Sequence, residues 1–173
     1  YSIDRWEKLD EVKHKRLIEG EFDIIILDIY GVAKDIAKND GLDILQDIKT
    51  KNPSQVVVAY SGHSFDFSKN KFWELADEKL TKPTPFVGTQ EIIDQLIDQT
   101  FNVQYHVDHI KNILKPNNAT DSYNQVEKLF LKYKKESSEP NWFSELNFLT
   151  IKDKEKLKIA SILRKLFKYS HLS

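Results

Sequence analysis

Short apolar runs alternate with amphipathic segments through the first half of the chain. The runs predict strands over residues 24–27, 55–60 and 79–81. Apolar residues at helical spacing predict helices over residues 4–20, 41–51 and 72–76. The first run is aliphatic without polar alternation, which is typical of a strand covered on both faces in a parallel sheet. Strands and helices that alternate with short links predict an α/β fold with a doubly wound parallel sheet.

In the second half of the chain the pattern is helical only. Apolar residues over 93–114 step alternately by three and four positions, which predicts one long helix with a heptad seam. Two further amphipathic helices are expected over 121–136 and 154–169. The sequence therefore predicts an α/β domain over residues 1–97 and a helical extension over residues 98–173. The seam either joins two copies as a homodimer or is buried within the helices of one chain.

Composition and charge are those of an ordinary globular protein. The 173 residues are 40% apolar and 31% charged, with a net charge of -1. Residues 1–100 carry 13 basic and 19 acidic side chains, and residues 101–173 carry 13 basic and 8 acidic ones. There is no cysteine and no apolar run of membrane-spanning length, so we expect a cytoplasmic protein without disulfides or membrane contact. Methionine is absent even at position 1, so we expect that the chain either begins inside a longer protein or lacks some residues of its parent sequence.

Three reactive side chains fall at the ends of the three expected strands. Asp28 closes the first strand, Ser61 follows the second, and Lys82 follows the third. The carboxyl ends of parallel strands lie at one rim of a sheet, where ligands bind in such folds, so we expect these residues to converge. A carboxylate can attack phosphorus to give an acyl phosphate, while a hydroxyl and an ammonium stabilise the phosphoryl oxygens. Each residue alone is common turn material, and only the ordered set indicates function.

The same residues belong to four segments that resemble the receiver domain of two-component response regulators. These segments are Glu19–Asp28, Asp40–Leu45, Val56–His63 and Leu80–Pro83. The resemblance implies a flavodoxin-like fold in which Asp28 accepts a phosphoryl group from a histidine kinase or a phosphotransfer protein of a phosphorelay. It also implies that Ser61 is the switch hydroxyl, that Lys82 is the phosphoryl partner, and that Asp28 and the backbone carbonyl of Tyr30 bind Mg²⁺. The domain would be a regulatory phosphoacceptor rather than a turnover enzyme, with the helical extension as its output.

Three features depart from the receiver pattern. Receivers begin with a strand that ends in an acidic pair of metal ligands, and this chain begins after that strand and its helix, so we expect a longer parent protein to carry them. The loop over residues 29–40 is several residues longer than its counterpart, and it is either a lid or partner contact beside Asp28 or a solvated insertion. Lys79 replaces the aromatic switch residue, so we expect a different output route, for which Tyr60 is one candidate.

Two other functions fit part of the pattern. In the first, the domain is a pseudo-receiver scaffold that binds a partner, and Asp28 is never phosphorylated. In the second, Leu27–Val32 is similar to the first motif of haloacid-dehalogenase-type phosphatases, which also use a nucleophilic Asp. Those enzymes need a second Asp two residues later for acid/base catalysis. Tyr30 stands at that position, which argues against turnover as a phosphatase.

The helical extension offers weaker chemical signals. His106 and His109 lie three residues apart, a spacing compatible with half a metal site or a phosphorelay histidine. No Cys and no second His pair supports a metal site, so solvated or interface histidines are the simpler interpretation. Lysines over residues 132–135 and 152–168 are interleaved with Glu and with regularly spaced apolar residues, which indicates solvated helix faces. We therefore expect no nucleic-acid partner.

Overall fold

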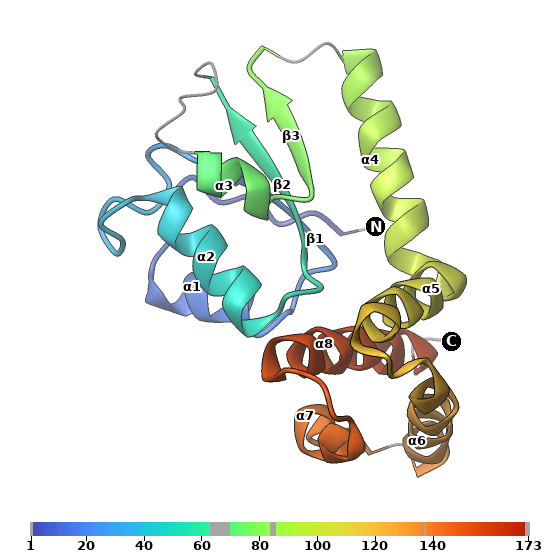
Figure 1. Ribbon diagram of the computed structural model, residues 1–173. Coiled ribbons are helices and arrows are strands. Elements are labelled where there is room, and N and C mark those ends of the chain that lie inside the picture. Colours follow the sequence, from blue (N-terminus) through green and yellow to red (C-terminus); the bar gives the residue numbers. More distant parts are fainter. Residues whose placement is uncertain (1, 63–69, 84–85, 137, 172–173) are drawn as a thin grey trace. The chain divides into compact units, whose positions relative to one another are not determined.

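The computed structural model describes residues 2–62, 70–83, 86–136 and 138–171 (Figure 1). The chain divides into two compact units, the first extending to Thr100 and the second beginning at Phe101. Over its described residues, the first unit contains a three-stranded parallel sheet in the order β1-β2-β3 together with helices. The expected α/β class with a parallel sheet is confirmed. None of the helices in the described part of the chain has the length and apolar composition of a membrane span.

The described strands and helices lie close to the expected ones. In chain order they are α1 (Glu11–Ile18), β1 (Ile24–Asp28), α2 (Gly41–Lys51), β2 (Val56–Ser61), α3 (Asn70–Leu75), β3 (Glu78–Thr81), α4 (Phe86–Phe101), α5 (Val103–Leu114), α6 (Tyr123–Glu136), α7 (Trp142–Glu145) and α8 (Asp153–Ser170). Short 3-10 turns are η2 (Lys115–Asn117), η3 (Thr120–Ser122) and η4 (Leu146–Phe148). The turn expected at His63 and Ser64 lies outside the described residues.

The first helix starts later than its apolar spacing predicts. Asp10 has an extended backbone, with φ -122°, and its side chain accepts a hydrogen bond from the N–H of Lys13 at 2.8 Å. This is a helix N-cap, which fixes the start of α1 at Glu11. The prediction of a helix from residue 4 is therefore wrong, and residues 4–9 form a non-helical segment.

The register of the sheet separates the side chains of the strands onto two faces. β1 pairs with β2 from Ile24 opposite Val56 to Asp28 opposite Tyr60, and β2 pairs with β3 over Val58–Ser61. One face of the sheet packs against apolar residues of α1, α2 and α3. On the other face Val58 and Leu80 pack against Leu96 of α4. Burial on both faces explains why β2 is aliphatic over residues 56–59, whereas Ile26 of β1 stays 55% exposed.

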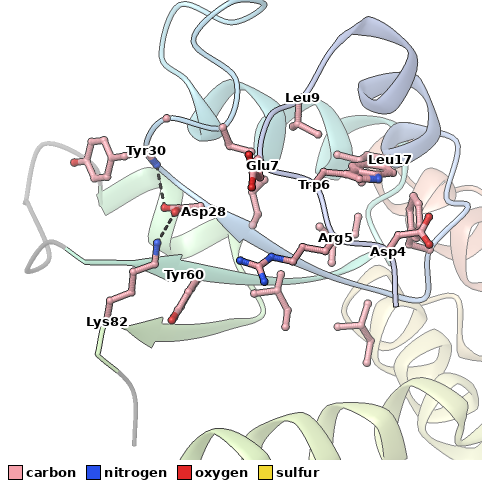
Figure 2. A pocket seen from close by; sticks show the side chains of 17 residues that line it. Asp4, Arg5, Trp6, Glu7, Leu9, Leu17, Asp28, Tyr30, Tyr60 and Lys82 are labelled. Atoms are coloured by element: carbon pink, nitrogen blue, oxygen red, sulfur yellow. Dashed lines mark hydrogen bonds and ion pairs between the residues drawn. The ribbon is translucent and has the colours of Figure 1, made fainter. Parts of the chain in front are cut away.

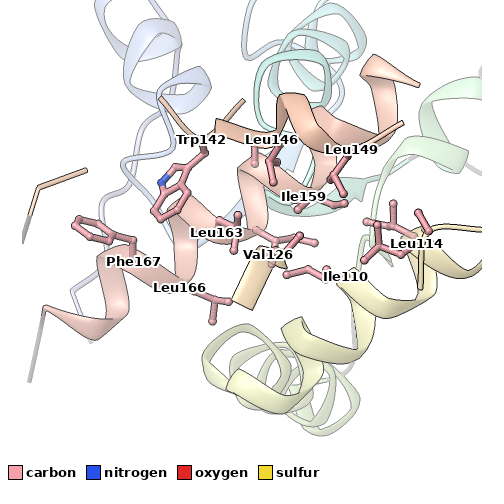
Figure 3. Close-up of a cluster of buried hydrophobic side chains, with 14 residues drawn as sticks. Ile110, Leu114, Val126, Trp142, Leu146, Leu149, Ile159, Leu163, Leu166 and Phe167 are labelled. Carbon is pink, nitrogen blue, oxygen red and sulfur yellow. The ribbon is translucent and has the colours of Figure 1, made fainter. Parts of the chain in front are cut away.

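The second unit is a bundle of helices around a buried tryptophan. Trp142 is fully buried and contacts the rings of Phe130 and Tyr133. Its ring also contacts that of Phe167, and both side chains are drawn in Figure 3. Leu146 is equally buried, while Phe148, two residues later, is 40% exposed.

The long helix expected over residues 93–114 is interrupted at Asn102. The side chain of Asn102 accepts a hydrogen bond from the N–H of Tyr105 at 3.1 Å and so begins a new helix, α5. The seam is divided as a result: Leu96 packs in the first unit, whereas Ile110 and Leu114 belong to the core of the second. Homodimerisation through this seam remains a prediction, with these three side chains already buried within the chain.

Candidate functional site

Asp28 and Lys82 form an ion pair at the carboxyl end of the sheet, although they lie 54 residues apart in the sequence (Figure 2). Their side chains are 34% and 36% exposed, so the pair is open to solvent. The N–H of Tyr30 donates a hydrogen bond to Asp28 Oδ1 at 3.2 Å. Lys82 Nζ also lies 4.5 Å from the centre of the Tyr60 ring, a cation–π distance. The acid and the amine predicted from the sequence are therefore brought together.

Strand geometry accounts for this convergence. Asp28 lies opposite Tyr60 in the ladder, and Tyr60 lies opposite Leu80. Side chains alternate between faces along a strand, so Lys82, two residues after Leu80, falls on the same face as Asp28. The N–H of Lys82 donates to the carbonyl oxygen of Ser61 at 2.7 Å, which continues the β2–β3 ladder by one residue. The Lys82 backbone is thereby fixed where its side chain reaches Asp28.

Ser61 reaches the same rim in a different orientation. Ser61 is fully buried, and it directly follows Tyr60 in β2. Strand alternation directs its side chain to the face opposite Asp28, toward the side covered by α2 and α3. The structure thus joins the Ser61 backbone to Lys82, and the role of the Ser61 hydroxyl as a switch stays a prediction.

The loop between β1 and α2 is anchored to the domain core. The carboxylate of Asp40 accepts hydrogen bonds from the backbone N–H groups of Gly31 and Ala33, the latter at 2.7 Å. Ile29 and Ala33 are each only 1% exposed and pack in the core of the first unit. A freely solvated insertion is therefore the wrong description of this loop. Sequence reasoning missed the anchoring role of Asp40, for which the only signal was an Asp before the glycine that starts α2.

A second carboxylate closes the same loop at the start of α2. Asp43 accepts hydrogen bonds from the backbone and side-chain nitrogens of Asn39, each at 2.9 Å. The backbone hydrogen bond from Asn39 is the main cause that holds the pKa of Asp43 below its ordinary value. Because the folded-state pKa is lowered, this contribution to stability is fully present above about 4, the ordinary range of an Asp, and is lost as the pH falls further, through the lowered pKa.

Removing the Asp40 carboxylate is expected to destabilise the first unit. Asp40→Ala leaves the backbone N–H of buried Ala33 without its acceptor, and hydrogen bonds to charged groups contribute about 1.5–3 kcal/mol. We expect a loss of that order in the free energy of unfolding, measured by urea denaturation. The matched control is Asp35→Ala in the same loop, since the Asp35 side chain is 73% exposed and its loss should cost about 0.5 kcal/mol or less. Equal losses in the two variants would contradict the anchoring role.

A cavity of about 540 Å³ extends from the Asp28–Lys82 pair along β1. All five residues of β1 line it, together with Asp4–Glu7 of the N-terminal segment and the side chains of Tyr30 and Tyr60. Figure 2 shows Arg5 projecting into this space. Sequence reasoning missed the contribution of the N-terminal segment, because a helix was expected there.

The described residues do not by themselves fit a magnesium site. Mg²⁺ binds several oxygen ligands in octahedral geometry. Asp28 is already engaged by Lys82 and by the N–H of Tyr30, and no group of three or more His, Cys, Asp or Glu suited to a metal occurs among the described residues. His106 and His109 do not form a metal site with other described residues either. His106 is buried, with 3% of its surface exposed, whereas His109 is exposed.

No protein-family model, curated protein or solved structure matches this chain. Its chemistry is therefore judged from the site itself: a solvent-accessible carboxylate paired with an ammonium group, the neighbouring Tyr60 ring, and a cavity that opens beside them.

Proposed function

We propose that the first unit is a phosphoacceptor receiver of a two-component system, with a doubly wound, flavodoxin-like topology. Asp28 takes a phosphoryl group from a histidine kinase or a phosphotransfer protein in the cytoplasm. The observation that carries the proposal is the ion pair between Asp28 and Lys82 at the carboxyl ends of parallel strands. An accessible carboxylate beside an ammonium group suits attack on a phosphoryl group, because the cation offsets the negative charge of the donor.

The proposed transfer requires only a small change at the site. An oxygen of the Asp28 carboxylate forms a bond to phosphorus, while the bond from phosphorus to the donor atom breaks and its electron pair leaves with the donor. The product is an acyl phosphate, which carries close to two negative charges in place of one. Lys82 then pairs with the phosphoryl oxygens instead of the carboxylate, and its contact with the Tyr60 ring changes with it. Tyr60 thus becomes a candidate reporter of the phosphorylated state.

The proposal also concerns a metal ion and an output region. Mg²⁺ takes part only if carboxylates outside the described residues complete its site. The helical unit is the output region in this proposal, and the loop over residues 29–40 is an anchored contact surface beside Asp28.

A second candidate function is a pseudo-receiver scaffold that is never phosphorylated. The observation in its favour is that Lys82 already neutralises Asp28, while the described residues hold no cluster of carboxylates that would bind a metal. In that case the pair is structural and joins the ends of β1 and β3.

Labelling with a small phosphoryl donor separates the two candidates. We expect acetyl phosphate, with Mg²⁺ present, to add one phosphoryl group to the intact protein, detected by mass spectrometry, and hydroxylamine to remove it as it removes acyl phosphates. Asp28→Asn should abolish the label, and Asp35→Asn, an exposed aspartate outside the site, should retain it. Lys82→Ala should lower the labelling rate about tenfold or more, as expected for the loss of a charge-assisted contact. An unlabelled wild-type protein would favour the scaffold.

A further inference from the structure

Tyr60 stands between the two charged groups of the site in the order of the strands. It belongs to β2, the central strand, where it is paired with Asp28 of β1 on one side and with Leu80 of β3 on the other. Its ring centre lies 4.5 Å from Lys82 Nζ, and the same ammonium group forms the ion pair with Asp28. Figure 2 shows the Tyr60 ring beside the Lys82 side chain, below the Asp28 carboxylate. The Lys82 ammonium group therefore has two partners, a carboxylate and an aromatic ring.

The Tyr60 ring is held more firmly than the lysine side chain that it contacts. The ring is partly buried and packs against the side chains of Val58, Leu80 and Leu96. Its strand is paired on both sides, so the place of the ring does not depend on the open side of β1. Lys82 follows the end of β3, and its flexible side chain is 36% exposed. The ammonium group at its tip stays at the rim only where partners hold it there.

We propose that Tyr60 is a positioning residue, whose ring holds the Lys82 ammonium group at the rim while Asp28 is phosphorylated. This inference rests on the proposed phosphoacceptor function. As the Asp28 oxygen bonds to phosphorus and the bond from phosphorus to the donor breaks, the carboxylate charge that attracted Lys82 is lost, and the ammonium group moves to the phosphoryl oxygens. The Tyr60 ring is a contact that the ammonium group keeps through this step, because the face of an aromatic ring attracts a cation at all stages.

The ring face, rather than the hydroxyl group, is the part of Tyr60 that this role requires. The cation–π contact is made to the ring itself. An aliphatic side chain at this position would still pack against Leu80 and Leu96, but it would offer the ammonium group no negative face. Loss of a cation–π contact at a partly exposed site corresponds to a change of about two- to tenfold in a rate.

The contact itself can be tested without phosphorylation, by NMR of the full chain. Protons over the face of an aromatic ring are shielded, so we expect the ε-CH₂ signals of Lys82 to lie upfield of those of exposed lysines. Their loss in Lys82→Ala assigns them. Tyr60→Phe should keep the upfield shift, and Tyr60→Leu should remove it. A wild-type protein in which the Lys82 signals coincide with those of exposed lysines would overturn the proposal.

The positioning role is tested by the rate at which acetyl phosphate, with Mg²⁺ present, labels Asp28. We expect Tyr60→Leu to lower this rate about two- to tenfold and Tyr60→Phe to leave it unchanged. In a Lys82→Ala background Tyr60→Leu should have no further effect, since the ring acts through Lys82. Equal losses in the two backgrounds would show that Tyr60 acts on the fold instead, and equal losses in Tyr60→Leu and Tyr60→Phe would assign the effect to the hydroxyl group. Either result would overturn the proposal.

Val58→Ala provides the matched control. Val58 is fully buried in the same cluster as the Tyr60 ring and lies two residues before it, on the same face of the sheet. The variant removes packing but keeps the ring, so it should label at the wild-type rate, and circular dichroism should show that it is folded. A loss equal to that of Tyr60→Leu would assign the effect to packing and overturn the proposal.

The same experiment distinguishes this inference from the function on which it rests. A wild-type protein that takes no label would overturn the proposed function and the positioning role with it. A labelled wild type whose rate is unchanged in Tyr60→Leu would overturn the positioning role alone.

Discussion

Gly41→Ala is expected to lower the free energy of unfolding of the first unit by about 3 kcal/mol, at the upper end of the usual range for overpacking. A Cβ atom at this position would lie 2.5 Å from the carbonyl oxygen of Asp28 and 2.9 Å from the Cα of Ile29. Both atoms are backbone, so no side-chain rotation relieves the clash. The N–H of Gly41 also donates to the carbonyl oxygen of Ile29 at 3.1 Å, which holds α2 against the end of β1. Urea denaturation followed by circular dichroism measures the loss.

The same substitution should also reduce phosphoryl labelling of Asp28, because the displaced backbone is that of the acceptor itself. Gly88→Ala is the matched control: Gly88 lies in α4, and a Cβ there would meet no atom within 4 Å. Replacing a helical glycine by alanine stabilises by up to about 1 kcal/mol, so this variant should unfold at the same or a higher urea concentration. Similar midpoints for the two variants would show that the approach of α2 to β1 is looser than the structure indicates.

The Asp28–Lys82 pair was predictable because it follows from topology. A polar residue at the end of each apolar run marks the carboxyl end of a strand, and parallel strands bring those ends to one rim. The face on which each side chain lies was harder to predict, because a shift of one residue in the register of a strand moves every side chain to the opposite face. Ser61 illustrates this, because a register that pairs Asp28 with Tyr60 places the following residue on the other face.

The N-terminal segment shows why apolar spacing misled the prediction of the first helix. Trp6 and Leu9 continue the helical spacing of α1, and both are at least partly buried. They are covered without a helix: the Trp6 ring meets Phe22 edge-on at 5.3 Å, and the Arg16 guanidinium lies 5.0 Å from it. Periodicity reports burial, whereas the N-cap at Asp10 decides where the helix begins.

The heptad seam shows a similar limit. Its spacing marked inward-facing positions only in part, since Val103 is 61% exposed. The buried positions serve two separate cores, one around Leu96 and one around Ile110 and Leu114. A single polar residue, Asn102, divides them by capping the second helix. The cap is a local hydrogen bond from the N–H of Tyr105 to the Asn102 side chain. This bond competes with the continuous helix that the apolar spacing predicted.

Trp142→Ala is expected to cost the second unit about 4 kcal/mol, within the 3–5 kcal/mol typical of large aromatic residues in cores. Trp142 is fully buried and joins three helices, since its ring centre lies 6.1 Å from Phe130, 5.7 Å from Tyr133 and 5.9 Å from Phe167. Small domains have only about 5–15 kcal/mol of total stability, so this loss should remove a large fraction of it and lower the midpoint of thermal unfolding by more than about 10 °C. Thermal denaturation followed by circular dichroism measures it.

Two further variants separate the volume of the Trp142 ring from its polar atom. The Nε1 atom of Trp142 has no hydrogen-bond partner among the described residues, so Trp142→Phe removes volume without breaking a hydrogen bond. It should therefore cost clearly less than the alanine variant, while Phe148→Ala, at a 40% exposed position, should cost less still. If Trp142→Phe proved as damaging as Trp142→Ala, an interaction of the indole N–H would have to hold the bundle. Equal effects of Trp142→Ala and Phe148→Ala would instead place the centre of the core away from Trp142.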